Sequence, residues 1–355
     1  MKSKYIVVFT PYFKKSVIRD LQRVDNASKA EIFLTDEAML VSSSLSQKDF
    51  FEKLKKVKSA FIKHICPAEK VSLLTGMIDS DRQTVLNEVL NKGLKISGGE
   101  KFCVQARIAG AGAEYSCKDI EVFVGTYLEK LGGVPTFSAD KLTSENGVKI
   151  ISIYIHGKDL YIGISDSSDN MNFGCDEYRL LSKGGRQISR AENKLKEAVS
   201  KYGLNLYLKN DVESIMSGGK KALDIGAAPG GWTKVLLDAG YEVVAVDPGK
   251  LKDELLENPK LTHYKCKIED LSFDSEFDII TNDINVEPKI TGEIMNKLSS
   301  FLKSGGMAVV TLKLPGNPET GIAEGVEVLS KKYDVLSVDS LFHNRREVTA
   351  LIRKK

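Results

Sequence analysis

The stretch Lys221–Asp247 combines small residues and acids at a spacing that suits the binding of a nucleoside. It reads as a short apolar run, a turn rich in glycine and alanine, a helical pattern, and a second apolar run that Asp247 closes. In a β-loop-α-β unit of this kind, small turn residues let the backbone approach a ligand closely, and the acid after the second strand binds a ribose diol. A further acid, Asp224, lies near the end of the first run. We therefore predict a nucleoside site; the alternative is a glycine turn that only lets the chain turn tightly.

The turn at residues 226–232 reads G-A-A-P-G-G-W. A dinucleotide-binding fold would show G-x-G-x-x-G and would bind a pyrophosphate at the N-terminus of the following helix. Here Pro229 removes a backbone donor, and Trp232 adds a large flat side chain. This composition indicates a nucleoside that carries an amino-acid tail rather than a pyrophosphate.

The motif DxGAxPGGW resembles the first motif of S-adenosylmethionine-dependent methyltransferases, in particular that of the FtsJ-like ribose 2'-O-methyltransferases. The resemblance implies that S-adenosylmethionine (SAM) is the cofactor. It places Gly226, Gly230 and Trp232 at the methionine end of SAM, and Asp247 at or near its ribose.

The adenine end departs from the pattern of the family. Its members often carry an acid after the third strand that meets the adenine amino group, whereas this chain has Lys267 at the aligned position. Glu269, Asp270 or a backbone group is the alternative partner. The residues expected to bind the cofactor are Asp224, Gly226, Ala227, Gly230, Trp232, Asp247 and Asp270.

Four charged residues stand where the ligand-facing edge of such a sheet is expected. Lys194 lies in SRAENKLKEA, Asp283 ends the strand pattern DIITND, and Lys313 ends MAVVTLK. Glu347 precedes the apolar run VTALI. Each one alone is typical of a surface charge at the end of an element, but together they match the Lys-Asp-Lys-Glu tetrad of the FtsJ-like family. The resemblance implies that these four residues are catalytic.

Acid–base chemistry suits this set. A ribose 2'-hydroxyl is a poor nucleophile at neutral pH, and a base that helps it needs a pKa close to the working pH. Desolvation and a neighbouring cation both lower the pKa of a lysine, so Lys313 beside Lys194 is predicted to be the general base. Asp283 and Glu347 are predicted to orient the two ammonium groups. A methyl sulfonium is already activated, so the remaining catalysis is in-line alignment.

Two other functions stay open at this point. One is methyl transfer to the exocyclic N2 amine of a guanine in tRNA. Enzymes of that kind usually show N/D-P-P-Y after the fourth strand, whereas this chain has Asn282, Asp283, Ile284 and Asn285 there. The other is a non-catalytic RNA-binding or assembly factor that keeps the fold. The two lysines beside two carboxylates argue against both.

The elements that must position these residues follow an α/β pattern from about residue 189 onward. Short apolar runs alternate with helical patterns, which predicts a doubly wound, mostly parallel, Rossmann-like sheet. A helix over 190–201 carries Lys194. The predicted strands are 222–225, 242–246, 263–266, 277–281, 307–311 and 348–352, and the further predicted helices are 232–238, 291–301 and 323–332.

Two smaller parts precede this methyltransferase domain, which is predicted at 183–355. Residues 1–72 follow the order β-α-β-β-α-β, which matches the ferredoxin-like unit, and Pro67 marks the predicted boundary. Residues 73–182 form an α+β pattern that resembles the THUMP domain of RNA-modifying enzymes. The whole order resembles the RlmM family of 23S ribosomal RNA methyltransferases. The resemblance implies a structured RNA substrate, either ribosomal RNA of the large subunit or tRNA.

Basic residues gather where the predicted RNA-binding part meets the methyltransferase part. The stretch RLLSKGGRQISR carries Arg179, Lys183, Arg186 and Arg190. We predict that these cations contact RNA phosphates; the alternative is a solvated linker.

Composition is that of an ordinary soluble globular protein of two or three domains. Of 355 residues, 42% are hydrophobic and 28% charged, and the formal net charge of +3 means that RNA binding must depend on local basic clusters. No apolar segment is long enough for a membrane helix, so a cytoplasmic location without membrane partners is expected. Five scattered cysteines without a C-x-x-C pair predict reduced thiols and no metal site. The oligomeric state is left open.

Overall fold

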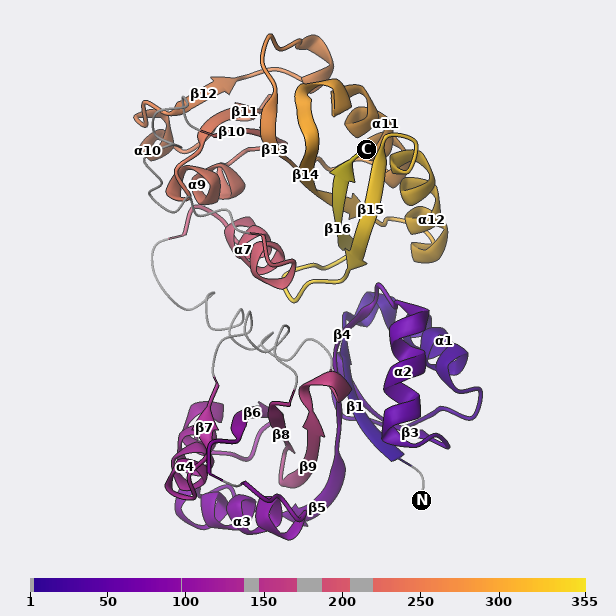
Figure 1. Cartoon of the computed structure of the whole chain (residues 1–355), viewed down its shortest axis with the longest axis vertical. Helices are drawn as coiled ribbons and strands as arrows, with labels where there is room; N and C mark the ends of the chain where they lie inside the picture. Colours follow the sequence, from indigo (N-terminus) through magenta and orange to yellow (C-terminus); the bar gives the residue numbers. More distant parts are fainter. Residues whose placement is uncertain (1–2, 97, 137–146, 171–186, 205–219) are drawn as a thin grey trace. The chain divides into compact units, whose positions relative to one another are not determined.

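A computed structural model describes residues 3–96, 98–136, 147–170, 187–204 and 220–355 (Figure 1). The chain divides into two compact units, Met1–Asp176 and Glu177–Lys355. The boundaries predicted at residues 72 and 182 stay predictions.

The first unit begins with an antiparallel sheet in the order β2-β3-β1-β4. Its strands are β1 (Ser3–Phe9), β2 (Lys29–Phe33), β3 (Ala38–Ser43) and β4 (Ile62–Pro67), and its helices are α1 (Lys14–Val24) and α2 (Gln47–Val57). The order β-α-β-β-α-β expected from the sequence is therefore present. Ser46 caps α2 by accepting a hydrogen bond from the backbone N–H of Asp49, and the ring of Phe50 stacks on Tyr5 with centroids 4.0 Å apart.

The second sheet of the first unit has the order β5-β9-β8-β6-β7. It consists of β5 (Glu69–Leu73), β6 (Lys101–Ala109), β7 (Val134–Pro135), β8 (Lys149–His156) and β9 (Asp159–Asp166), with helices α3 (Ile78–Asn91) and α4 (Cys117–Lys130). Val85, Ile120 and Ile153 lie in one buried cluster, so both helices pack on this sheet. Its assignment to the THUMP family stays a prediction.

The second unit is built on a seven-stranded sheet in the order β12-β11-β10-β13-β14-β16-β15. The strands from β12 to β14 run parallel, and β16 runs antiparallel to both of its neighbours. The elements are α7 (Ala191–Lys201), β10 (Lys221–Ile225), α9 (Gly231–Asp238), β11 (Glu242–Val246), α10 (Asp253–Leu256), β12 (Leu261–Tyr264), β13 (Phe277–Asn282), α11 (Pro288–Leu298), β14 (Leu302–Lys313), α12 (Pro318–Leu329), β15 (Tyr333–Asp339) and β16 (Glu347–Lys354). This architecture confirms the predicted Rossmann-like α/β fold.

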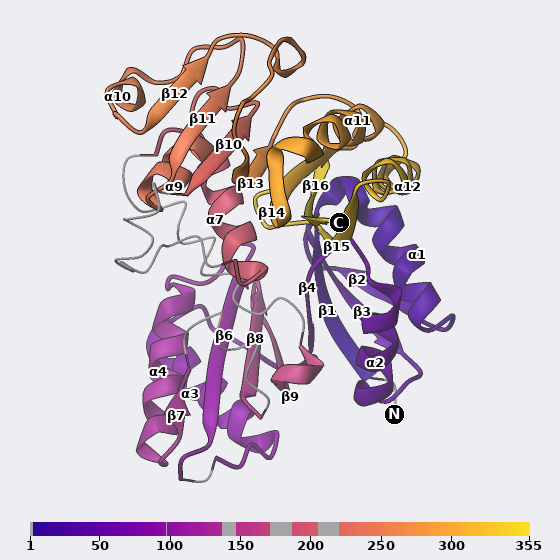
Figure 2. The ribbon, with the colours of Figure 1, turned by 45° about the horizontal axis from the view of Figure 1, so that its top comes forward.

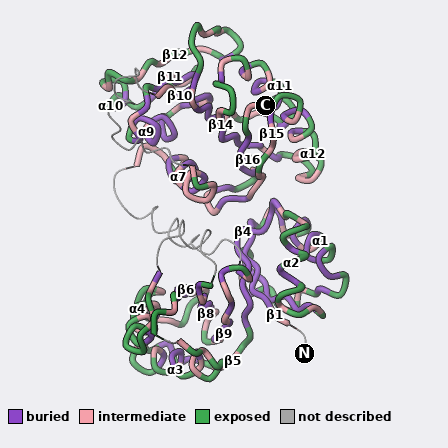
Figure 3. Tube along the Cα trace, viewed as in Figure 1, coloured by how far each residue is buried: buried purple, intermediate pink, exposed green. Residues whose placement is uncertain are grey.

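Helices cover this sheet as two packed pairs, α7 with α9 and α11 with α12 (Figure 2). Ile279, Val309 and Leu351, from three adjacent strands, share one buried cluster with Leu195 of α7. Leu312 lies three residues after Val309 on β14, so its side chain points to the other face of the sheet. On that face, a Cβ added to Gly325 of α12 would lie 3.3 Å from Leu312. The two pairs therefore cover opposite faces, and the buried strands run between them (Figure 3).

Within the described ranges, the longest and most apolar helices still fall short of what is needed to cross a membrane. Cys66, Cys103, Cys117 and Cys266 are free thiols, as predicted, whereas Cys175 lies outside the described residues.

Candidate active site

Strand direction brings three of the four predicted catalytic residues to one edge of the sheet. Asp283 directly follows β13, and Lys313 is the last residue of the parallel strand β14. Glu347 begins β16, which is antiparallel to β14, and the register places it directly opposite Lys313. The start of one strand therefore meets the ends of the other two.

Side-chain alternation then turns these residues to the same face. Successive side chains of a strand point to opposite faces, so positions an even number of residues apart share a face. Asp283 lies four residues after Ile279, and Lys313 lies four residues after Val309, both of which pack under α7. The helix that carries Lys194 covers the face on which the other three charges lie.

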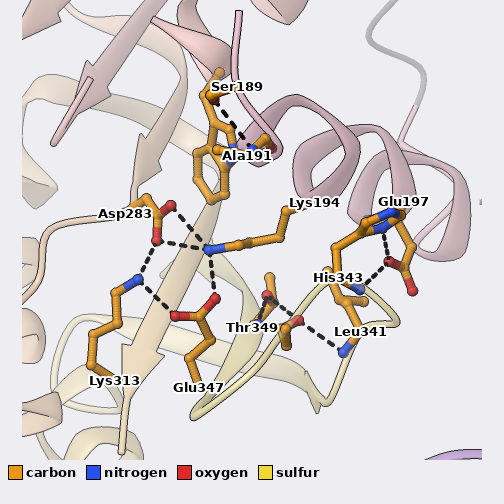
Figure 4. A network of polar contacts seen from close by, with 12 residues as sticks. Ser189, Ala191, Lys194, Glu197, Asp283, Lys313, Leu341, His343, Glu347 and Thr349 are labelled. Atoms are coloured by element: carbon orange, nitrogen blue, oxygen red, sulfur yellow. Dashed lines mark hydrogen bonds and ion pairs between the residues drawn. The ribbon is translucent and has the colours of Figure 1, made fainter. Parts of the chain in front are cut away.

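The four side chains form a closed ring of alternating charge (Figure 4). Lys194 Nζ donates to Asp283 Oδ1 and Oδ2 at 3.1 and 3.0 Å and lies 2.7 Å from Glu347 Oε1. Lys313 Nζ donates to Asp283 Oδ1 and to Glu347 Oε2, each at 2.8 Å. Each carboxylate thus contacts both ammonium groups.

Burial distinguishes the two lysines. The side chain of Lys194 is 8% exposed and that of Lys313 is 17% exposed, so Lys313 is the more open of the two. Burial alone would raise the pKa of Asp283, but the ammonium groups of Lys194 and Lys313 hold it below its ordinary value. The ring is therefore a set of charged groups, in which two positive and two negative formal charges sum to zero.

The predicted lowering of the pKa of Lys313 is wrong for this arrangement. Burial does act to lower it, but Asp283 and Glu347 act in the opposite direction and raise it above the ordinary value of 10.5. The sequence-based argument considered the neighbouring cation and underestimated the two carboxylates that separate the lysines.

Trp232 packs against the helix that carries Lys194. Its indole is 2% exposed, its Nε1 donates to the backbone oxygen of Ala191 at 2.7 Å, and Lys194 Nζ lies 5.9 Å from the ring centroid. The neighbouring Gly231 leaves no room for a side chain, because a Cβ there would lie 2.3 Å from Ser189 Oγ. Trp232 therefore helps to hold α7 against α9, and its contact with a cofactor stays a prediction.

The glycine-rich turn lies directly beside Asp283. The backbone N–H of Asp283 donates to the oxygen of Ile225 at 3.0 Å. Gly226 has φ +74°, and a Cβ on it would come within 2.8 Å of the backbone nitrogen of Ile284. Any larger residue would push the turn away from the tetrad.

Asp247 lies at the carboxyl end of β11, half-buried, with its side chain turned into the same turn. Its Oδ2 accepts from the N–H of Ala228 at 3.1 Å, and its Oδ1 accepts from the N–H of Gly249 at 2.6 Å. A carboxylate offers about four lone-pair positions, so capacity remains for hydroxyl donors. Ala227 is buried next to it in a small apolar cluster with Ala245.

The carboxylate of Asp224, which was predicted to bind the cofactor, is buried beneath this turn. It is 1% exposed, and it accepts hydrogen bonds from Thr233 Oγ1 at 2.6 Å and from Thr281 Oγ1 at 2.9 Å. Burial raises its pKa to about 6. Asp224 therefore supports the turn from inside the domain.

The remaining predicted residues lie in different surroundings. Asp270 is exposed at the end of the short helix Ile268–Asp270. Gly230 directly precedes α9 with φ +113°, where a Cβ would lie 2.2 Å from Leu255 Cδ1. Arg190 is exposed at the start of α7, and Arg179, Lys183 and Arg186 lie outside the described residues.

Sequence reasoning missed one residue of α7 that acts on the same region. Glu197 lies three residues after Lys194 and is 4% exposed. It accepts from the N–H groups of Phe342 and His343 and from His343 Nδ1, at 2.6, 3.2 and 2.9 Å. A buried acid one turn from a predicted catalytic lysine was the available signal.

Residues 187–334 match the family model of the FtsJ-like methyltransferases. This part of the chain is an FtsJ-like methyltransferase domain. The matched range includes Lys194, Asp283 and Lys313 and ends before Glu347. Glu347, the first residue of β16, is therefore assigned to the tetrad by its register opposite Lys313.

The chain also has curated relatives. Over 212 residues the chain is 28% identical to the ribosomal RNA large subunit methyltransferase M of Psychromonas ingrahamii, and the match covers 56% of this chain and 55% of the relative. Over 222 residues it is 30% identical to the protein of the same name from a Marinomonas species, covering 59% and 60%. The chain thus spans little more than half the length of these relatives.

A crystal structure of TrmN from Thermus thermophilus aligns with 99% of this chain and 100% of its own, at 12% identity and a TM-score of 0.37. We draw no conclusion from a likeness of that size. Among the described residues, no group of three or more His, Cys, Asp or Glu side chains is arranged to hold a metal ion.

Proposed function

We propose that this protein is a SAM-dependent methyltransferase that methylates a ribose 2'-hydroxyl of structured RNA, with large-subunit ribosomal RNA as its substrate. The observation that carries the proposal is the closed ring of Lys194, Asp283, Lys313 and Glu347 directly beside the glycine-rich turn. Two lysines held by two carboxylates form a proton-accepting and hydroxyl-orienting site. A site that only bound RNA would have no need of it.

The turn suits SAM in the chemistry of its groups. Asp247 offers a half-buried carboxylate for the two ribose hydroxyls, and the buried Ala227 packs with Ala245 to support the same turn. Gly226 keeps the turn free of a side chain beside Asp283, since a Cβ there would lie 3.0 Å from the backbone carbonyl carbon of Asp283. SAM would supply a methyl group on a positively charged sulfur that needs no further activation.

Lys313 is the residue that accepts the 2'-hydroxyl proton. It is the more exposed lysine of the ring, and it must be neutral when the hydroxyl attacks. The two carboxylates that raise its pKa also hold its Nζ in one place, which orients the nitrogen lone pair once the proton has left. Lys194 keeps Asp283 ionised while that happens. The carboxylates thus keep more of Lys313 protonated at neutral pH, but they also fix the position of its Nζ relative to the hydroxyl.

The relatives support the choice of RNA. The curated relatives described above bear the name of a ribosomal RNA large subunit methyltransferase. We extend that substrate class to this chain, with tRNA as the second RNA to be tested. The exposed Arg190 at the start of α7 is proposed as one phosphate contact, together with Arg179, Lys183 and Arg186.

Methyl transfer to a guanine amine fits the site less well. Base methyltransferases of that kind use the side chain at the position of Asn282 to hold the amine. Here Asn282 is fully buried, its Nδ2 donates to Met295 Sδ at 3.5 Å, and its Oδ1 accepts from the N–H of Ile284 at 3.0 Å. Its amide is therefore engaged inside the domain and turned away from a substrate.

Mapping of the methyl group tests the proposal. Purified protein and labelled SAM are incubated with ribosomal RNA, either naked or as ribosomal particles, from cells that lack the protein, and with tRNA from the same cells. A 2'-O-methyl group interrupts the alkaline hydrolysis ladder at one nucleotide. An unbroken ladder on labelled RNA would instead identify a base methyltransferase, and absence of label on every RNA would indicate a non-catalytic binder.

A further inference from the structure

The connection between β15 and β16, residues 340–346, is held in one conformation although it lies outside the strands. We refer to it as the 340–346 loop. On one side Glu197 of α7 accepts from the N–H groups of Phe342 and His343 and from His343 Nδ1. These bonds tie the first half of the loop to the helix that carries Lys194.

A second set of bonds fixes the other half of the loop. The side-chain oxygen of Asn344 accepts from the N–H of Leu341 at 2.9 Å, and its amide group bonds Thr349 Oγ1 at 3.3 Å. The N–H of Leu314, just after Lys313, donates to the backbone oxygen of Arg346 at 2.8 Å. Leu341 and Asn344 are 1% and 2% exposed, so this part of the loop is packed like a core.

Two arginines lie at the end of this fixed loop. Arg345 and Arg346 are both exposed, and they immediately precede Glu347 of the tetrad. Because consecutive Cα atoms are about 3.8 Å apart, both arginines have their Cα within about 7 Å of that of Glu347. Two exposed arginines therefore lie next to the edge of the site.

The tetrad itself does not supply a net positive charge for a phosphate. Two ammonium groups and two carboxylates sum to zero, so the ring itself exerts no net attraction on a phosphate. In RNA, however, the carbon that bears the 2'-hydroxyl adjoins the carbon that bears the 3'-phosphate. Any ribose that places its 2'-hydroxyl at Lys313 must bring a phosphate diester to the border of the tetrad.

We infer that Arg345 and Arg346 form a phosphate subsite for the RNA backbone next to the methylated ribose. The inference rests on the proposed function and adds to it the group that positions the target nucleotide. Guanidinium groups suit phosphate oxygens because their donors form a planar fork. The fixed backbone of the 340–346 loop lowers the conformational entropy that the arginines lose on binding.

The double variant Arg345→Gln/Arg346→Gln tests the subsite. The dissociation constant of a fluorescein-labelled RNA hairpin is measured over a range of salt concentrations, and the KM for ribosomal RNA from cells that lack the protein is measured alongside. We expect both constants to rise roughly tenfold, and the slope of log affinity against log salt to fall by about 1 for each phosphate that the variant no longer binds. The double variant Arg345→Lys/Arg346→Lys should keep most of the salt slope.

Arg353→Gln is a control for the loss of a single arginine away from the tetrad. Arg353 lies near the far end of β16, is exposed, and pairs with Asp334 at 3.1 Å, so its loss removes one positive charge of the same unit away from the tetrad. The dissociation constant for SAM, measured by calorimetry, shows that each variant is folded. If the glutamine double variant matches the control in KM, affinity and salt slope while the wild type methylates RNA, the subsite is refuted and the proposed function stands. If the wild type methylates no RNA, the proposed function fails, and the salt slope alone decides the subsite.

Discussion

Lys313 and Glu347 lie directly opposite each other at the open end of the β14–β16 pair, with Nζ and Oε2 2.8 Å apart. An antiparallel register joins the last residue of one strand to the first residue of the other, so the contact follows from strand order. The same contact helps to raise the pKa of Lys313 above its ordinary value. The proposed base is therefore protonated at neutral pH, which makes the rate of methylation depend on pH.

Glu347→Gln should shift that dependence to lower pH. In the wild type kcat is expected to rise steadily with pH from neutral into the alkaline range, because only the neutral amine of Lys313 accepts a proton. Removing one carboxylate removes a group that favours the ammonium form, so the folded pKa of Lys313 falls. The alkaline limb of kcat against pH should move towards neutral pH in the variant, even though kcat at its plateau is lower.

Asp334→Asn serves as the control for this measurement. Asp334 is an exposed carboxylate that pairs with Arg353 away from the tetrad, so its loss changes the net charge of the domain equally. The pH profile of this variant should coincide with that of the wild type. A Glu347→Gln profile that also coincides with wild type would show that Lys313 is not the group that titrates.

Lys313→Ala should abolish most of the activity and leave cofactor binding intact. A positioned general base contributes roughly 100-fold to 10,000-fold in rate, so kcat should fall by that factor. Lys303→Ala is the control, since Lys303 lies on the same strand and pairs with Asp278 at 2.7 Å on the surface. Methyl transfer is followed with labelled SAM, and SAM binding by calorimetry. Wild-type turnover by Lys313→Ala would remove the base from the mechanism.

Glu197→Ala should lower kcat through the position of Glu347. The buried carboxylate of Glu197 holds the 340–346 loop with three hydrogen bonds, and Glu347 follows that loop directly. We expect kcat to fall roughly tenfold, as for the loss of a group that aligns reactants, and the alkaline limb of the pH profile to shift as in Glu347→Gln. A merely structural role would lower stability and leave the pH profile unchanged.

Lys201→Ala separates those two outcomes. Lys201 is on the same helix as Glu197 and pairs with Asp339 at 2.8 Å, so its removal also loosens α7 against the end of β15. The partner of Lys201 is the last residue of β15, so the substitution does not remove the hydrogen bonds between Glu197 and the 340–346 loop. The variant should be less stable than wild type but should keep the wild-type pH profile.

The tetrad was predicted as a set through the resemblance to the FtsJ-like family. Asp283, Lys313 and Glu347 lie at strand ends, whereas Lys194 lies inside α7. Strand alternation and parallel direction then bring Asp283 and Lys313 together without further information. The strand Tyr333–Asp339 was not predicted, since it is a half-exposed edge strand whose register shifts between Val335 and Ser337. The pKa of Lys313 could not be predicted either, because it depends on which carboxylate pairs with it across the sheet.

In the glycine-rich turn, the sequence did not show which motif side chains are exposed to a ligand and which are buried. Asp224 and Trp232 belong to the motif and were therefore assigned to the ligand, yet both side chains are buried and hydrogen-bonded inside the domain. Motif letters do not tell whether a side chain contacts the ligand or supports the backbone that does. Only the burial of each side chain separates these roles.

Asp224→Asn should make the domain relatively more stable as the pH rises. The folded pKa of Asp224 is raised to about 6 from an ordinary value of 3.8, chiefly by burial. Between these two values the unfolded chain loses the proton while the folded domain keeps it, so wild-type stability falls with rising pH and then stays lowered. An asparagine has no such proton. The free energy of unfolding of the variant minus that of wild type should therefore increase across this range, by up to about 3 kcal/mol.

Trp232 makes the measurement possible, because it is the only tryptophan of the chain and lies in the core that contains Ala222 of β10. Its fluorescence follows urea unfolding of this unit at each pH. Thr233→Val supplies the companion test: Thr233 donates to Asp224 Oδ2 and lowers its pKa, so the valine variant should extend the loss of stability to higher pH. A difference between Asp224→Asn and wild type that stays constant with pH would mean that Asp224 has the same pKa in the folded and the unfolded chain, so that its two threonine bonds compensate fully for burial.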